Sequence, residues 1–153
     1  MRISQTLLDT VIEHCRRGYP DEACGIVTGF SGKARRVYCL TNVAPDKSRR
    51  YLIDAREQFR VFREMREAGE ELVAIFHSHP ATAAYPSQTD VDLAFYPQAA
   101  YVIVSLAGSR PDVRAYRIDR ERRSVVPVAV IVESESPDVR KDEHSRRTEP
   151  GGY

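Results

Sequence analysis

Apolar residues recur at helical spacing in two segments of the chain. The first follows Ser4, a candidate N-cap, and predicts an amphipathic helix that ends at Gly18. The second follows Asp54, whose pairing with Glu57 three residues later resembles a capping box. This second stripe predicts a helix that ends at Gly69.

Other segments are continuously apolar and rich in β-branched residues, as is typical of strands. The run 72–76 leads into His77 and predicts a buried central strand. The dipeptide Ser31-Gly32 is a turn signal between two such segments and predicts a hairpin. The other strands are expected at 23–28, 36–43, 51–53, 100–106, 113–118 and 125–132.

A polar loop separates the central strand from the next helix. Residues 80–89 include two prolines and are expected to form this loop. Ser87, with Asp90 three residues later, predicts the start of a short third helix that ends near Pro97. The whole pattern predicts an α/β fold of the α+β kind, a mixed sheet sandwiched by two to three helices.

The length of 153 residues allows one domain with a core of its own. From residue 133 onward the only aliphatic side chain is Val139, and charged residues, Ser, Pro and Gly fill the rest. Such a segment cannot offset its ordering entropy by burial. We therefore expect a folded domain over 1–133 and a disordered charged tail over 134–153.

The composition excludes several classes of protein. The 23 Lys and Arg residues nearly balance the 22 Asp and Glu residues, so neither a nucleic-acid partner nor a membrane-surface partner is expected. The three cysteines form no C-x-x-C motif, which indicates neither a disulfide framework nor a cysteine-rich zinc site. No uninterrupted apolar stretch resembles a signal peptide or a membrane span, and a cytoplasmic protein is expected.

Four polar residues lie at the end of the central strand and in the loop after it. Residues i and i+2 of a strand face the same side, so His77 and His79 project together as candidate metal ligands. Asp90, in the first turn of the next helix, is the nearest carboxylate on a rigid element. Two imidazoles and one carboxylate leave a fourth position free for water, which is typical of catalytic rather than structural zinc.

A hydrolytic zinc site also needs a general base and a donor for the oxyanion. Glu22, where the chain enters the first strand of the hairpin, and Ser87 are the candidates. Simpler interpretations stay open: Ser87 as an N-cap with Asp90 as its dipole partner, and Glu22 as a surface acid. Cys24 lies two residues after Glu22 and is expected to be a small core residue.

The order of these residues resembles the motif of the JAMM (MPN-plus) metallopeptidases. Glu22 is followed by His77-Ser78-His79-Pro80, seven residues separate His79 from Ser87, and two more precede Asp90. The resemblance covers about residues 2–132 and implies a cytidine-deaminase-like α/β/α sandwich that binds one zinc ion per chain. It implies that His77, His79 and Asp90 are the ligands, Glu22 the general acid/base and Ser87 the oxyanion stabiliser.

The resemblance also implies a substrate class. Members of the family cleave bonds after the C-terminal glycines of ubiquitin-like proteins, and this chain is most similar to the small bacterial enzymes among them. Those enzymes release cysteine from a sulfur-carrier protein whose carboxyl end is Gly-Gly. A partner of this kind is therefore expected, with the tail lying along an exposed strand edge.

Three other functions compete with this hypothesis. A zinc deaminase would need H-x-E with P-C-x-x-C, and the chain has neither motif. A non-catalytic scaffold of the same fold would lack some of the five motif residues, all of which are present. An isopeptidase that removes ubiquitin-like modifiers from lysines has the same motif and is separable only by assay.

Overall fold

The computed structural model describes residues 1–135. Its helices are α1 (Gln5–Gly18), α2 (Ala55–Glu67) and α3 (Gln88–Asp92). Its strands are β1 (Arg2–Ser4), β2 (Cys24–Phe30), β3 (Lys33–Leu40), β4 (Glu71–His79), β5 (Ala100–Ser105), β6 (Asp112–Asp119), β7 (Ser124–Val128) and β8 (Ile131–Glu133). The expected tail from residue 136 onward, including Gly151-Gly152-Tyr153, lies outside the described residues.

The strands form one mixed sheet in the order β7-β6-β5-β4-β2-β3-β1-β8. Strand β4 lies in the interior of this sheet, antiparallel to β2 and parallel to β5. Strands β7 and β8 are at opposite ends of the order, although only two residues separate Val128 from Ile131. Because so short a segment spans at most about 11 Å, the sheet must curl until its two ends approach each other.

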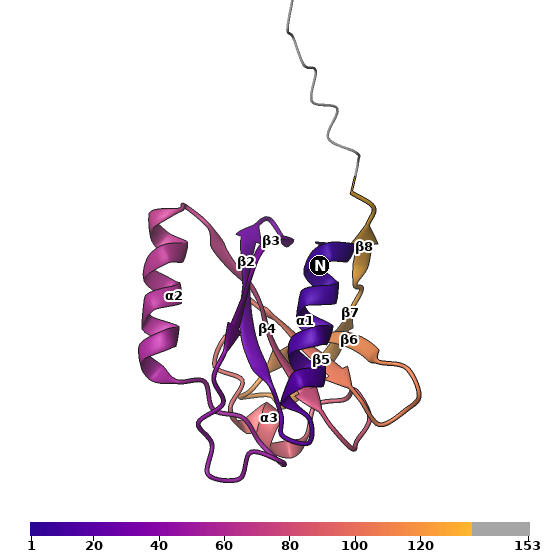
Figure 1. Ribbon diagram of the computed structural model, residues 1–153. Coiled ribbons are helices and arrows are strands. Elements are labelled where there is room, and N and C mark those ends of the chain that lie inside the picture. The colour runs from indigo at the N-terminus through magenta and orange to yellow at the C-terminus, as the bar shows by residue number, and fades with distance from the viewer. Residues whose placement is uncertain (136–153) are drawn as a thin grey trace, which may run out of the picture.

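Each face of the sheet has its own apolar core. Helix α1 covers one face with Leu8, Val11 and Cys15, which pack around Phe76 of β4. Helices α2 and α3 cover the other face, where Val61 belongs to the second cluster. Figure 1 shows α1 and α2 on opposite sides of the sheet. The expected mixed sheet sandwiched by two to three helices is confirmed, with three helices in residues 1–135.

The helix starts follow from their capping residues. Ser4 Oγ accepts a hydrogen bond from the backbone N–H of Leu7 at 3.2 Å and so begins α1, as predicted. Asp54 caps α2 in the same way, but Glu57 does not complete the expected capping box. The Glu57 carboxylate instead accepts bonds from the backbone N–H and hydroxyl of Thr41, at 2.7 and 2.8 Å.

Gly25 permits the close packing of three strands near the end of β4. A Cβ atom at this position would lie 2.2 Å from the carbonyl oxygen of Tyr38 and 2.3 Å from the Phe76 ring. Both distances are far inside van der Waals contact, so only glycine fits. The Phe76 ring therefore lies against β2 directly beside the strand position that carries His77.

Three expectations about strands differ from the structure. Residues 51–53 form no strand, and only Ile53 makes an isolated bridge to Asn42. The expected strand 125–132 is divided into β7 and β8, because the second part leaves the β6 edge and pairs with β1. Strand β1 itself was not expected, since three residues are too short for a detectable period.

The third helix and the central strand also differ in length. Helix α3 ends at Asp92, well before Pro97. Strand β4 continues past the apolar run to His79, because β2 and β5 supply backbone partners on both sides. Within residues 1–135, no helix has the length and hydropathy needed to cross a membrane.

Candidate metal centre

The two histidines lie at the end of β4 on the face covered by α2 and α3. His77 pairs with Cys24 of β2 and with Ile103 of β5, so its backbone is held on both sides. The side chains of His77 and His79 are only 1% and 5% exposed. Their same-side projection, expected from the i, i+2 spacing, is confirmed by a distance of 3.1 Å between the two Nε2 atoms.

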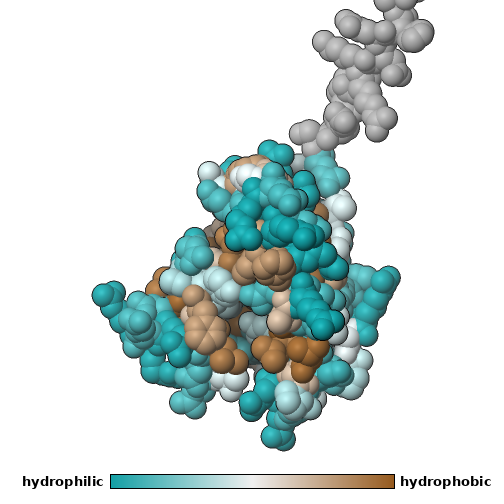
Figure 2. All heavy atoms as spheres, turned by 90° about the vertical axis from the view of Figure 1, so that its left-hand side faces the viewer, coloured by the Kyte–Doolittle hydropathy of each residue, from teal (hydrophilic) through white to brown (hydrophobic). Residues whose placement is uncertain are grey.

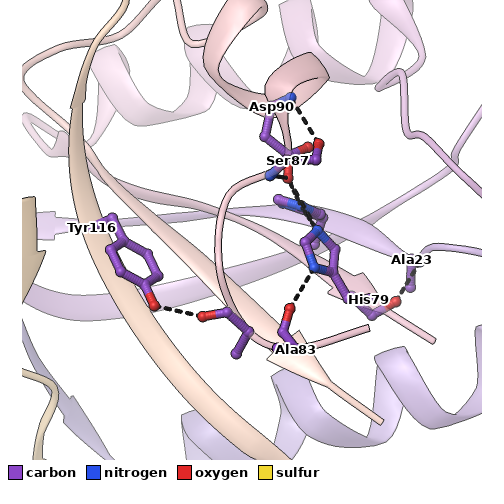
Figure 3. Close-up of polar contacts among 9 residues, drawn as sticks. Ala23, His79, Ala83, Ser87, Asp90 and Tyr116 are labelled. Carbon is purple, nitrogen blue, oxygen red and sulfur yellow. Dashed lines mark hydrogen bonds and ion pairs between the residues drawn. The ribbon is translucent and has the colours of Figure 1, made fainter. Parts of the chain in front are cut away.

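The loop after β4 is held at three consecutive backbone carbonyls. Ser105 Oγ donates to the carbonyl of Thr82 at 2.6 Å, and the Tyr116 hydroxyl donates to that of Ala84 at 2.5 Å. Between them, the Ala83 carbonyl accepts a bond of 2.8 Å from His79 Nδ1. Figure 3 shows the bond from His79 to Ala83 and the bond that the Tyr116 hydroxyl donates. Side chains of β4, β5 and β6 thus fix the loop and, with it, the position at which α3 begins.

Asp90 is oriented by a reciprocal capping box at the start of α3. Its backbone N–H donates to Ser87 Oγ at 3.0 Å, while its Oδ2 accepts from the Ser87 backbone N–H at 2.9 Å. The same Oδ2 lies 3.2 Å from His77 Nε2 and 3.0 Å from His79 Nε2. The cap therefore directs the Asp90 carboxylate at the two imidazoles.

The spacing of these three atoms fits a tetrahedral metal ion. The Nε2 atoms of His77 and His79 and Oδ2 of Asp90 lie 3.0–3.2 Å apart. Ligand atoms about 2.0–2.1 Å from a tetrahedral zinc ion lie about 3.3 Å from one another. These buried residues form a group that could hold a metal ion.

The hydrogen bond to Ala83 gives an independent argument for a cation. A carbonyl oxygen only accepts, so His79 Nδ1 carries the proton that it donates. In the neutral imidazole, Nε2 of His79 then has a lone pair directed at the Asp90 carboxylate 3.0 Å away. Two acceptors at this distance require a proton or a metal ion among them.

The pKa values of His77 and Asp90 reflect the same charge balance. Burial lowers the pKa of His77 and outweighs its hydrogen bond to Asp90. For Asp90, burial acts to raise the pKa, but the bonds to His77 and His79 outweigh it and hold the pKa well below its usual range. The group therefore contains a carboxylate and a neutral imidazole, which are the forms that bind zinc.

Glu22 is a buried acid beside this group rather than a surface residue. It is 6% exposed, and its Oε2 atom has no hydrogen-bond partner within the described residues. Burial raises its pKa to about 8, and the negative charge of Asp90 adds to this shift, while His79 and Arg50 oppose it. A carboxyl group with such a pKa can accept and return a proton near neutral pH.

Asn42, which the sequence analysis did not single out, holds Glu22 and the loop beside it. Its Nδ2 donates to the carbonyls of Glu22 and Arg50, at 2.9 and 3.0 Å. Its Oδ1 accepts from the backbone N–H groups of Ala44 and Leu52, at 2.9 and 3.0 Å. The buried amide joins segments that are distant in sequence, so only the folded chain reveals it.

Two other residues singled out from the sequence, Ser87 and Cys24, differ in their exposure to solvent. Ser87 is exposed, and since its Oγ accepts the capping bond, its own O–H is free to donate to a ligand. Cys24 is fully buried, and burial raises the pKa of its thiol to about 12, as expected for a core residue. His14 lies apart from the metal group and hydrogen-bonds to the Cys24 carbonyl.

Comparison with known families agrees with this geometry. Residues 4–119 match the family described as prokaryotic homologs of the JAB domain, and the chain belongs to this family. It is 43% identical over 132 residues to the CysO-cysteine peptidase of Mycobacterium tuberculosis, covering 84% of this chain and 90% of that protein. It is 34% identical over 107 residues to the desampylase of Haloferax volcanii, covering 65% of this chain and 76% of that one.

Solved structures share the fold of this chain. A protein from Desulfitobacterium hafniense superposes with a TM-score of 0.77 at 32% identity, covering 88% of this chain and 93% of that one. A JAB1/MPN domain protein from Archaeoglobus fulgidus superposes with a TM-score of 0.57 at 21% identity, covering 86% and 99%, and shares the fold. The chain is a JAB-type hydrolase, and the JAMM resemblance is confirmed.

Proposed function

We propose that this hydrolase uses zinc to cleave the amide bond after the C-terminal Gly-Gly of a ubiquitin-like sulfur-carrier protein. The reaction releases cysteine and so belongs to cysteine biosynthesis. The observation that carries the proposal is the buried His77, His79 and Asp90 group with Glu22 beside it, in a chain 43% identical to a CysO-cysteine peptidase.

One zinc ion per chain would be held by His77, His79 and Asp90. It would supply a Lewis acid that lowers the pKa of water and polarises a carbonyl group. The ligand atoms support this assignment by their spacing of 3.0–3.2 Å and by the lone pair that His79 directs at Asp90. A two-histidine, one-carboxylate set is also the donor chemistry of hydrolytic zinc sites.

During hydrolysis, Glu22 would transfer the proton and Ser87 would stabilise the negative charge of the oxyanion. Glu22 takes a proton from water as the water oxygen bonds to the carbonyl carbon of the last glycine. The Ser87 O–H donates a hydrogen bond to the oxyanion that forms there. When the carbon–nitrogen bond breaks, Glu22 returns the proton to the departing amino group of cysteine.

The surface beside the site is suited to a protein substrate. On the α2 side of the molecule, apolar side chains surround a hollow (Figure 2). A pocket of about 140 Å³ opens there, and its lining includes Tyr51, which also contacts His77. Leu52, Leu93 and Phe95 on its border are 54%, 46% and 57% exposed. Exposed apolar groups gathered in one place are typical of a surface that binds another protein.

The strand pairing around His77 bears on the path of the carrier tail, for which the sequence predicts a place along an exposed strand edge. Strand β4 is hydrogen-bonded to β2 on one side and β5 on the other, and the outer strands of the sheet are β7 and β8. Within residues 1–135, His77 therefore has a paired strand on both sides and no open edge for a tail. The loop 80–87, which carries Ser87, is the segment along which the extended Gly-Gly would lie.

Removal of ubiquitin-like modifiers from lysines is the alternative activity. The 34% identity to a desampylase favours this activity. The group of His77, His79 and Asp90 would act on the amide bond in the same way whether the departing amine belongs to cysteine or to lysine. A non-catalytic scaffold is disfavoured because it has no need of a buried Glu22 whose Oε2 atom has no hydrogen-bond partner within residues 1–135. The three free cysteines suit a reducing compartment, and we place the enzyme in the cytoplasm.

The decisive experiment offers two substrates to the zinc-loaded protein. One is a sulfur-carrier protein extended to Gly-Gly-Cys, and the other is the same carrier joined to a lysine side chain. Mass spectrometry should show loss of one cysteine from the first substrate and slower cleavage of the second. Faster cleavage of the lysine conjugate would favour the alternative, and cleavage of neither would refute both.

Glu22→Gln is the matched control, because it keeps the size of the side chain and removes its acid. It should bind zinc as the wild type does and turn over roughly 10² to 10⁴ times more slowly, the usual share of acid/base catalysis. Wild-type turnover in this variant would exclude Glu22 as the proton carrier.

A further inference from the structure

The two histidines of the metal group are held in different ways. The Nδ1 of His79 donates to the Ala83 carbonyl at 2.8 Å, which determines the plane of its ring. The Nδ1 of His77 is buried and has no hydrogen-bond partner within residues 1–135. Metal-binding histidines usually have such a partner for the second ring nitrogen. Something other than a hydrogen bond at Nδ1 must therefore support this side of the His77 ring.

Tyr51 supplies the missing support by packing. Its ring lies against the His77 ring with the centroids 4.4 Å apart and the planes 23° from parallel. The other aromatic neighbour of His77 is His79, whose ring is tilted by 60° at 4.9 Å. Tyr51 thus covers one flat face of the imidazole, and rotation of the His77 ring about its χ2 bond would strike the tyrosine.

Hydrogen bonds hold the backbone on both sides of Tyr51, so the position of its ring is fixed. The carbonyl of Arg50 and the N–H of Leu52 both bond to the buried side chain of Asn42, each at 3.0 Å. The Leu52 carbonyl also accepts from the N–H of Val43 at 2.8 Å. Since Asn42 bonds to the Glu22 carbonyl as well, one side chain joins Tyr51 to the proposed proton carrier.

We propose that Tyr51 is a positioning residue for the metal site: its ring, rather than its hydroxyl, holds His77 in the orientation that binds the ion. The inference rests on the proposed zinc site and adds a residue to it that makes no bond to the metal. Tyr51 also lines the apolar pocket beside the site. A substrate that fills this pocket therefore touches the residue that supports a ligand.

The test measures zinc affinity of the full-length protein by competition with a chromophoric chelator. Tyr51→Phe keeps the ring and should leave Kd within about twofold of the wild type. Tyr51→Leu removes the flat surface and should raise Kd by roughly 10-fold to 100-fold, as loss of a supporting contact does at other metal sites. Phe95→Leu removes a ring from the same pocket without a contact to His77, and should leave Kd unchanged.

A second readout separates positioning from general destabilisation. With cobalt in place of zinc, at saturation, the visible absorption bands report ligand geometry directly. They should change in Tyr51→Leu and stay as in the wild type in Tyr51→Phe and Phe95→Leu. If Tyr51→Leu fails to fold by circular dichroism, Tyr51→Met takes its place in both measurements.

Several results would overturn the inference. Wild-type Kd and wild-type cobalt bands in folded Tyr51→Leu or Tyr51→Met would remove any role of the ring. An equal loss of affinity in Tyr51→Phe would assign the effect to the hydroxyl instead. A wild-type protein that takes up no zinc would refute the metal site itself, an outcome distinct from the first two.

Discussion

Ser78 of β4 and Ala23, the residue directly before β2, are joined by two hydrogen bonds. Ser78 Oγ accepts from the backbone N–H of Ala23 at 2.8 Å, and the backbone N–H of Ser78 donates to the Ala23 carbonyl at 3.0 Å. Ser78 lies between the two candidate ligands His77 and His79, and Ala23 directly follows Glu22. The pair therefore sets the position of the proposed proton carrier relative to the metal group.

The first prediction tests this link with Ser78→Ala. The substitution leaves the N–H of Ala23 unsatisfied in a buried site, so the free energy of unfolding should fall by about 1–3 kcal/mol. Turnover should fall as well, because Glu22 loses a contact that places it. Urea unfolding measures the first effect. Thr10→Ala, on the exposed face of α1, is the control and should change stability by less than about 0.5 kcal/mol.

The second prediction concerns the ligands themselves. Purified wild-type protein should hold one zinc ion per chain, and His77→Ala or Asp90→Asn should lose it, since either change removes one of three donors. Elemental analysis after gel filtration checks the metal content. His14→Ala should keep its zinc, because His14 bonds to the Cys24 carbonyl and is not one of the three candidate ligands. Zinc retained by both ligand variants would mean that the ion binds elsewhere.

The third prediction follows from the raised pKa of Glu22, about 8 in the folded chain against 4.5 as its ordinary value. Between these values the folded metal-free protein binds a proton that the unfolded chain has released, so stability from this group is lost as pH rises. Stability of the metal-free wild type should thus fall between pH 5 and pH 8, by on the order of 3 kcal/mol from Glu22 alone.

Glu22→Gln isolates this contribution, because glutamine has no proton to release. In urea unfolding with a chelator present, the variant should match the wild type near pH 5 and be the more stable protein at pH 8. Equal pH dependence in the two proteins would show that the Glu22 carboxyl is solvated rather than buried.

The fourth prediction separates the two roles of Ser87. Ser87→Ala removes the N-cap of α3, at a cost of about 1 kcal/mol, and also the proposed oxyanion donor, at a cost of roughly 10²-fold to 10³-fold in turnover. Asparagine is also a good N-cap, so Ser87→Asn should recover the stability. Turnover should stay low in both variants, and full recovery by asparagine would leave capping as the whole role of Ser87.

Local patterns in the sequence were sufficient to predict two helix starts and most of the candidate site residues. The caps at Ser4 and Asp54 predicted where two helices begin, since capping depends on residues within one turn. The His77-x-His79 pair on a strand and Ser87 with Asp90 at a helix start are also local, and the structure brings all four together. Alternation along a strand and the geometry of one helical turn require no knowledge of the remaining chain.

Contacts between segments that are distant in sequence were determined only by the tertiary structure. Residues 51–53 have strand-like composition, yet among them only Ile53 forms a β-bridge. The N–H of Leu52 bonds to the Asn42 side chain rather than to a neighbouring strand. The stacking of Tyr51 on His77 and the burial of Glu22 likewise depend on which segments the curled sheet brings together. The sequence by itself determined which residues are candidates for binding a metal ion and for hydrolysis. The packing of distant segments determined their protonation and orientation, because desolvation and ring contacts arise only between surfaces that the folded chain brings into contact.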